Sequence, residues 1–175
     1  SFAKTYRGHG TDRALVAGVL GMEPSDERIR DSLKIASESG IEIEFIETDL
    51  GYEHPNTVKI IFHKKADDSF YVIGSSIGGG NIMITDIDGT KVEFTGDLPT
   101  LILKYNDKKG TISKISTTLS YNEINIATMK VTRNNKIATM ILETDSKIED
   151  NVIKEISKFN DVFYIKAINP IDERC

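Results

Sequence analysis

From Leu98 onward the chain carries a pattern of apolar residues that few folds can satisfy. Runs with apolar residues at alternate positions, and runs with apolar residues at every third or fourth position, follow in the order strand, helix, strand, strand, helix, strand. The strands are expected at residues 101–105, 124–132, 137–143 and 162–168, and the helices at residues 111–121 and 148–159. This order predicts a ferredoxin-like βαββαβ unit, in which two helices cover one face of an antiparallel sheet.

The half of the chain before Leu98 predicts a separate domain with a mixed sheet, so that the whole chain is of the α+β or α/β class. Residues 1–5 are expected to end a strand, a helix is expected after Pro24, and residues 41–45 alternate as a half-buried strand should. Further strands are expected at residues 58–63, 70–75, 81–87 and 91–94, with a hairpin turn at Asp88-Gly89.

The charge of the chain changes where these two patterns meet. Residues 1–97 hold 10 Lys and Arg against 17 Asp and Glu, whereas residues 98–175 hold 12 against 10. The change coincides with a turn-forming segment, Gly96-Asp97-Leu98-Pro99. We therefore expect two domains, one over residues 1–97 and one over residues 98–175.

Composition excludes several classes of function. Neither half has a basic stripe, so nucleic acid is not an expected partner. No apolar run is long enough to cross a bilayer, so no membrane association is expected. The single cysteine, Cys175, excludes an internal disulfide framework and an iron–sulfur cluster held wholly by this chain, which favours a cytoplasmic protein. A zinc site built from His9, His54 and His63 has no ligand spacing behind it, so no metal site is expected.

A polar loop near the N-terminus is the first candidate site. It consists of Arg7, Gly8, His9, Gly10, Thr11 and Asp12 and precedes an apolar run, residues 14–20, that can be helical. Thr11 or Asp12 is a candidate N-cap, and a helix start behind a glycine-containing loop attracts small anions such as an amino-acid carboxylate. His9, which lies between two glycines, favours a role toward a ligand or a partner subunit. The alternative is an ordinary strand-to-helix turn, in which Arg7 forms only a surface salt bridge.

Two other segments offer polar or glycine-rich turns. His54-Pro55-Asn56-Thr57 combines an imidazole with short hydrogen-bonding side chains, and Gly78, Gly79 and Gly80 interrupt the strands. Either segment is also compatible with a purely structural turn. Because loops at the carboxyl ends of strands gather at one edge of a sheet, we expect the N-terminal loop, the His54–Thr57 turn and the glycines to form one polar cleft.

The C-terminal pattern resembles an ACT domain over about residues 98–168. The resemblance is carried by the βαββαβ order, by Asn106, Asp107 and Gly110 after the first strand, and by Asn125 and Ile126 at the start of the second. It implies an amino-acid-binding loop at these positions and association of two copies through this domain. Lys109 stands where the family usually has proline before the loop glycine.

The N-terminal motifs resemble the β subunit of bacterial iron–sulfur-dependent L-serine dehydratase. The motifs are residues 6–15 with Gly18 and Gly21, then residues 54–57, then residues 75–80, in this order and ahead of the ACT-like unit. The N-terminal domain of that family is similar to the allosteric substrate-binding domain of phosphoglycerate dehydrogenases. The family's upstream serine-rich loop with a histidine is not in this sequence, and we expect it to precede Ser1.

The resemblance implies a subunit that works only with its α partner. L-serine is dehydrated to an enamine, which gives pyruvate and ammonia, and the iron–sulfur cluster that polarises the hydroxyl group belongs to the α subunit. Support of catalysis is implied for His9 and His54. Contact with substrate or effector is implied for Arg7, Gly8, Gly10, Thr11, Asp12, Asn56, Thr57, Gly78, Gly79 and Gly80. The alternatives are a free-standing amino-acid-binding regulatory module without catalysis, and the regulatory tail of a phosphoglycerate dehydrogenase-type enzyme.

Overall fold

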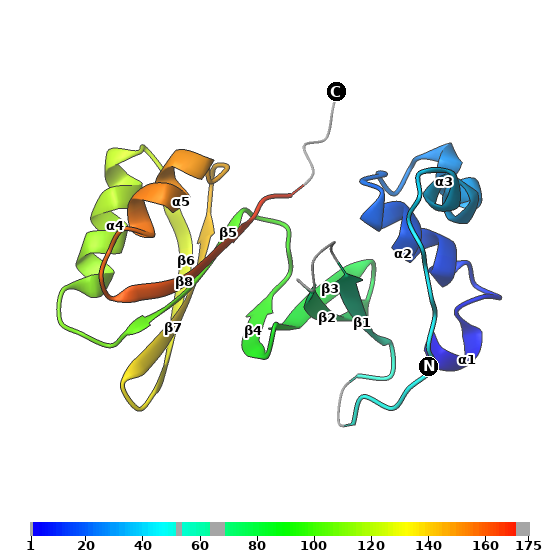
Figure 1. The fold of residues 1–175 in the computed structure, drawn as a ribbon, viewed down its shortest axis with the longest axis horizontal. Coiled ribbons are helices and arrows are strands. Elements are labelled where there is room, and N and C mark those ends of the chain that lie inside the picture. Colours follow the sequence, from blue (N-terminus) through cyan, green and yellow to red (C-terminus); the bar gives the residue numbers. More distant parts are fainter. Residues whose placement is uncertain (1, 52–53, 64–68, 171–175) are drawn as a thin grey trace. The chain divides into compact units, whose positions relative to one another are not determined.

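The computed structural model of the chain describes residues 2–51, 54–63 and 69–170 (Figure 1). The chain divides into two compact units: one runs to Phe94 and the other covers Thr95–Pro170. The α+β class is confirmed, with one four-stranded sheet in each unit. Cys175 lies outside the described residues.

The C-terminal unit has the predicted βαββαβ order. Its elements are β5 (Thr100–Asn106), α4 (Thr111–Tyr121), β6 (Ile126–Asn134), β7 (Ile137–Thr144), α5 (Asp150–Ile156) and β8 (Val162–Ile168). The strand order is β6-β7-β5-β8, and every pairing in it is antiparallel. The two helices lie on one face of this sheet, as expected (Figure 1).

One apolar core holds this unit together. Its central members are fully buried, among them Leu103 on β5, Leu119 on α4, Met140 on β7 and Ile156 on α5. Burying side chains of this size stabilises a fold by about 1.5–3 kcal/mol each. The core is continuous because strands and helices both turn apolar side chains into the space between the sheet and the two helices.

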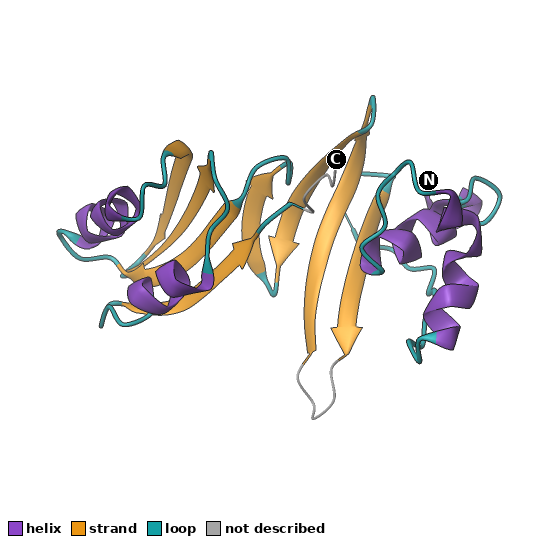
Figure 2. Cartoon of the chain, turned by 90° about the horizontal axis from the view of Figure 1, so that it is seen from above, coloured by secondary structure: helices purple, strands orange, loops and turns teal. Residues whose placement is uncertain are grey.

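The N-terminal unit combines a group of short helices with an antiparallel meander. The helices are α1 (Phe2–Thr5), α2 (Thr11–Val19), the 3-10 helix η1 (Glu27–Asp31) and α3 (Ser32–Glu38). The strands are β1 (Thr57–His63), β2 (Ser69–Gly78), β3 (Asn81–Ile87) and β4 (Thr90–Phe94), in the sheet order β1-β2-β3-β4. Figure 2 shows the helices grouped together beside the strands. Among the described strands all pairings are antiparallel, whereas a mixed sheet was expected.

Two expectations for the N-terminal unit are wrong, and a third needs a shift of its first residues. Residues 2–5 form the helix α1 and not the end of a strand. Residues 41–45 alternate like a strand but pair with no other strand in the part of the chain that the structure describes. The helix expected from Pro24 to Gly40 is present but begins later, as η1 followed by α3, and the Asp26 side chain accepts a hydrogen bond from the Arg28 amide at its start.

Two turns follow the sequence closely. Asp88 and Gly89 connect β3 to β4 with φ values of 50° and 76°, which are the two positive values that a type I′ turn requires. Gly110 precedes α4 with φ 88°. Among the described helices, none is long and apolar enough to cross a membrane.

Candidate functional site

The His54–Thr57 turn is hydrogen-bonded to the C-terminal part of β2. The Ser76 amide donates to the Asn56 carbonyl at 2.9 Å, and the hydroxyls of Thr57 and Ser75 lie 2.7 Å apart. β2 then ends at Gly78, and Gly79 and Gly80 turn the chain into β3, with positive φ at all three glycines. The turn and the glycine segment are therefore joined through one strand end.

The N-terminal loop reaches the same turn through α1. The Phe2 amide donates to the Pro55 carbonyl at 3.3 Å, so α1 contacts the His54–Thr57 turn directly. The N-terminal loop and the His54–Thr57 turn therefore lie close together, as expected, but the cause is not the one expected. The loop follows a helix and the turn precedes a strand, so the carboxyl ends of strands do not bring them together.

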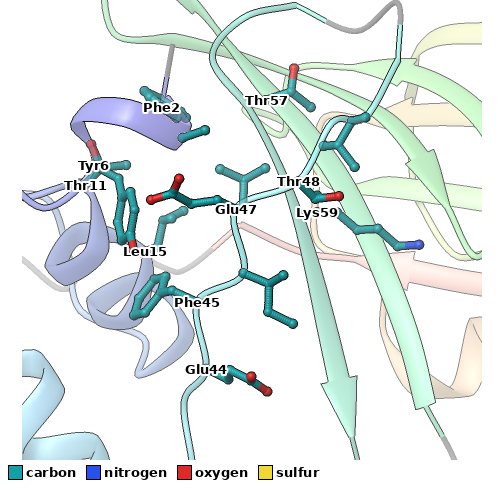
Figure 3. A pocket seen from close by; sticks show the side chains of 14 residues that line it. Phe2, Tyr6, Thr11, Leu15, Glu44, Phe45, Glu47, Thr48, Thr57 and Lys59 are labelled. Atoms are coloured by element: carbon teal, nitrogen blue, oxygen red, sulfur yellow. The ribbon is translucent and has the colours of Figure 1, made fainter.

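A cavity of about 150 Å³ lies between these segments. Its walls come from α1, from the start of α2, from residues 44–48 and from the start of β1 (Figure 3). Thr11 from the loop and Thr57 from the turn both line it. Tyr6 stacks on Phe45 with ring centroids 5.5 Å apart, which fixes one wall.

Other expected site residues lie outside this cavity. His9 and His54 are exposed and do not line it; the His54 Nδ1 atom accepts a hydrogen bond from the Asn56 amide at 3.2 Å. The Arg7 guanidinium donates to the Tyr6 hydroxyl at 3.1 Å and lies over the Tyr6 ring. Gly8 and Gly10 lie in the loop between α1 and α2, where Gly10 adopts φ 72°.

The start of α2 differs from the expected anion site. Gly10 is the N-cap, so neither Thr11 nor Asp12 caps the helix. The amides of Thr11 and Asp12 both donate to the Tyr6 carbonyl, and the Arg13 amide donates to the Asp12 carboxylate at 2.9 Å. An anion at a helix start binds to free amides of the first turn, and here these amides already have partners.

Sequence reasoning missed the linking stretch, by which we mean residues 41–50 between α3 and β1. It supplies six residues to the cavity wall, among them Glu44 and Glu47. The signal that could have found it is the break in alternation at Phe45-Ile46, where two apolar residues are adjacent. Phe45 faces Tyr6, while Ile46 is 71% exposed.

A second, larger cavity of about 360 Å³ adjoins the same stretch. Its lining is mostly apolar and comes from α2, from residues 41–45 and from β1. The two cavities share Leu15, Glu44, Phe45, Val58 and Lys59. The polar side chains of Thr11, Glu47, Thr48 and Thr57 line the smaller cavity only, so most of the polar groups that could orient a ligand lie there.

Lys59 lines both cavities but is engaged elsewhere. Its ammonium nitrogen lies 3.9 Å from the centroid of the Tyr71 ring, and Figure 3 shows it directed away from the smaller cavity. Burial and the neighbouring Asp86 carboxylate raise the pKa of the Tyr71 phenol. Asp86 is buried, accepts from the Gly89 amide at 2.7 Å and lies 3.4 Å from the Lys91 ammonium.

The residues expected to form an ACT ligand loop lie at the two ends of the C-terminal sheet. Asn106 ends β5 beside the start of β7, and Asp107 and Gly110 follow it, whereas Asn125 and Ile126 lie beside the end of β7. Asp107 forms an ion pair with Arg133 at 3.1 Å, and the Asn125 amide group donates to the Asp145 carboxylate. One copy of the chain does not bring the five residues together.

The residues of this chain do not fit an iron–sulfur cluster. The sequence contains one cysteine, and such clusters take several thiolate ligands. Within the described ranges, no group of three or more His, Cys, Asp or Glu side chains is placed to hold a metal ion.

Comparison with solved structures gives low overall similarity. The ACT domain from GTP pyrophosphokinase of Chlorobium tepidum is 23% identical, with a TM-score of 0.36, over 40% of this chain and 95% of that domain. The C-terminal domain of the MgtC protein from Mycobacterium tuberculosis is 14% identical, with a TM-score of 0.36, over 48% of this chain and 99% of that one.

Comparison of sequences is decisive, although no model of a known protein family matches the chain. The L-serine dehydratase β chain of Peptoniphilus asaccharolyticus is 41% identical over 173 residues, which cover 95% of this chain and 78% of that one. The probable L-serine dehydratase β chain of Bacillus subtilis (strain 168) is 38% identical over 170 residues, 96% of this chain and 77% of that one. D-3-phosphoglycerate dehydrogenase of the same strain is 30% identical over 141 residues, only 26% of its length. The chain belongs to the family of L-serine dehydratase β chains.

Proposed function

We propose that this chain is the β subunit of an L-serine dehydratase and that it works with a separate α subunit to convert L-serine into pyruvate and ammonia. One observation carries the proposal: the chain is 41% identical, over 95% of its length, to a relative that is named an L-serine dehydratase β chain. A β chain implies an α chain as its partner. The cluster that the family implies is assigned to that partner, because the donor set of this chain does not fit one.

In this proposal the chain contributes surface and orientation to the reaction. The small cavity can hold a molecule the size of an amino acid, since ligands of drug size need about 300 Å³ or more. His9 and His54 do not line the cavity and are exposed, and in this proposal their imidazoles face the partner subunit. A positioned imidazole can hold or donate a proton near pH 7, which gives both residues a supporting role.

Co-expression of the chain with its α partner tests the proposal. The complex is expected to form pyruvate from L-serine, and His9→Ala or His54→Ala is expected to lower that rate while the free energy of unfolding changes by about 0.5 kcal/mol or less. His63→Ala is the matched control, because His63 is exposed on β1 and lines only the larger cavity.

Two results would contradict this function. A chain that binds amino acids but never associates with an α subunit would be a free-standing regulatory module. Full activity of both histidine variants in the complex would remove their supporting role.

Self-association through the C-terminal unit belongs to the same proposal. The strands β6 and β8 form the edges of that sheet, and edge strands present unpaired backbone groups to a second copy. Because one copy separates Asn106 from Asn125, an amino-acid site of the ACT type would need residues from two copies. Sedimentation equilibrium of the whole chain measures this association.

A further inference from the structure

The linking stretch has the form of a β-strand without a partner strand. Within the described part of the chain, residues 42–48 form no backbone hydrogen bond, although apolar and acidic side chains alternate in the first half of the stretch. Ile41 and Ile43 are 37% exposed, and Phe45, which shares their side of the stretch, stacks on Tyr6. An extended segment with an apolar side and unpaired backbone groups is typical of an incomplete sheet.

β1 lies across the larger cavity from this stretch and has a free edge of its own. Among the described strands β1 pairs with β2 alone, so its other edge carries amide and carbonyl groups without a strand partner. Residues 41–45 and residues 58–63 both line the larger cavity, and α2 adds the apolar side chains of Leu15, Val16 and Val19. The cavity is therefore bounded by two extended segments and a helix.

The way in which these two segments line the cavity shows that it is a groove between backbone edges. Successive side chains of a strand point to opposite faces, so a cavity on one face contacts alternate residues only. Here consecutive residues line the cavity on both segments, 41–45 on one and 58–63 on the other. A groove of this kind fits an extended backbone, which can bind to both edges by main-chain hydrogen bonds. A small ligand would leave both rows of backbone groups unpaired.

The smaller cavity connects this groove to the first residue that the structure describes. Phe2 lines the smaller cavity, and its amide donates to the Pro55 carbonyl at 3.3 Å, two residues before β1 begins. Phe45 and Val58 line both cavities, so the groove continues from one cavity into the other (Figure 3). A segment that leads into Phe2 through the groove therefore ends where β1 starts, which makes it antiparallel to β1.

The same path gives a strand–helix–strand unit. Residues 41–43 line the larger cavity, which extends to the end of β1, whereas residues 46–48 line the smaller one, beside the start of β1. The linking stretch thus also runs antiparallel to β1, and a strand ahead of α1 would be parallel to the linking stretch. Parallel neighbours need a crossover of about a dozen residues or more, usually helical, and residues 2–40 with α1, α2 and α3 provide one.

We propose that a strand of the same subunit, encoded directly ahead of Ser1, fills the groove between the linking stretch and β1. The β chains of Peptoniphilus asaccharolyticus and Bacillus subtilis have residues for such an element, since the matched region covers only 78% and 77% of them. A strand that spans β1 needs about seven residues. Its apolar side chains contact α2, and its last residues separate the smaller cavity from the larger one. The completed sheet contains parallel and antiparallel pairs.

Hydrogen–deuterium exchange tests the proposal on two forms of the subunit: the chain from Ser1, and the chain extended by the residues that its gene encodes ahead of Ser1. The amides of residues 42–48 are expected to exchange about tenfold or more slowly in the extended chain, because there they gain strand partners. The edge strand β6 of the C-terminal unit is the internal control and is expected to exchange equally in both forms.

A matched pair of variants locates the strand. Ile43→Ala is expected to lower the midpoint of thermal unfolding of the extended chain and to leave that of the chain from Ser1 unchanged, because only the added strand buries Ile43. Ile82→Ala is the control: Ile82 is 47% exposed on β3 and lines neither cavity, so both forms are expected to respond to it equally.

Four results would overturn the inference. Equal exchange of residues 42–48 in the two forms would mean that no upstream strand occupies the groove. Protection in the chain from Ser1 that rises with its concentration would assign the groove to a second copy, and protection that needs the α subunit would assign it to that partner. A reading frame too short to encode a strand ahead of Ser1 would also exclude it. None of these measurements depends on dehydratase activity.

Discussion

The two units of this chain carry similar numbers of strands but bury their apolar residues very differently. In the C-terminal unit, β5, β7, α4 and α5 supply one continuous core. In the N-terminal unit Ile41, Ile43 and Ile46 of the linking stretch and Ile61 of β1 remain exposed to 37% or more. The difference teaches that apolar alternation specifies a strand only where a neighbouring strand and a core are available to it.

The largest expected effect is a difference in the free energy of unfolding between a core variant of the C-terminal unit and a variant of the linking stretch. Leu103→Ala, in the C-terminal core, is expected to lower the free energy of unfolding by about 2–5 kcal/mol, because it leaves a cavity among fully buried side chains. Ile46→Ala, on the linking stretch, is expected to change it by about 0.5 kcal/mol or less. Urea unfolding followed by far-ultraviolet circular dichroism measures both. Equal losses would show that the linking stretch is buried in solution.

A smaller effect is expected to be the same in both units. Gly10 and Gly110 precede α2 and α4 with φ of 72° and 88°, and in both cases an added Cβ would have no atom within 4 Å. Alanine at either position is therefore expected to cost about 1–2 kcal/mol through backbone strain alone. Gly18→Ala is the control, because Gly18 lies inside α2 and alanine there is expected to stabilise the helix by about 0.5–1 kcal/mol. A neutral Gly10→Ala would mean that this loop adopts another conformation.

The smallest expected effect concerns two tyrosines. Burial raises the pKa of the Tyr105 phenol, whose hydroxyl has no hydrogen-bond partner among the described residues, so Tyr105→Phe is expected to leave stability close to unchanged. The Tyr71 phenol interacts with Asp86, so Tyr71→Phe is expected to destabilise the chain more than Tyr105→Phe. Thermal unfolding of the two variants gives the comparison, and the reverse order would contradict it.

Sequence patterns predicted the C-terminal unit well because local and long-range signals agree there. The helix expected at residues 111–121 has the same first and last residue as α4. Gly110 is its N-cap, and Ile115 and Leu119 face the core. The hairpin between β6 and β7 follows from Asn135, which adopts φ 57° at the turn. Each of these elements would be recognised without knowing its neighbours.

The N-terminal unit was harder to predict because its decisive contacts join segments far apart in the chain. Nothing local shows that the Phe2 amide meets the Pro55 carbonyl, or that Phe45 stacks on Tyr6. Glu42 and Glu44 alternate with apolar residues, which is typical of a solvent-exposed strand face, and Glu47 follows the break in this alternation at Phe45-Ile46. Its place in a cavity wall follows from the path of the linking stretch, which no pattern in the sequence specifies.

The Tyr6 carbonyl, which accepts from the amides of both Thr11 and Asp12, has a consequence for how this segment can evolve. A backbone carbonyl binds the first two amides of α2, so the start of the helix requires glycine at position 10 but no particular side chain at Arg7 or His9. His9 is exposed and can be exchanged at little cost to folding. A selective pressure that keeps a histidine there would therefore act on the proposed contact with the partner subunit and not on folding. A mutational scan scored once for abundance and once for pyruvate formation from L-serine would separate the two.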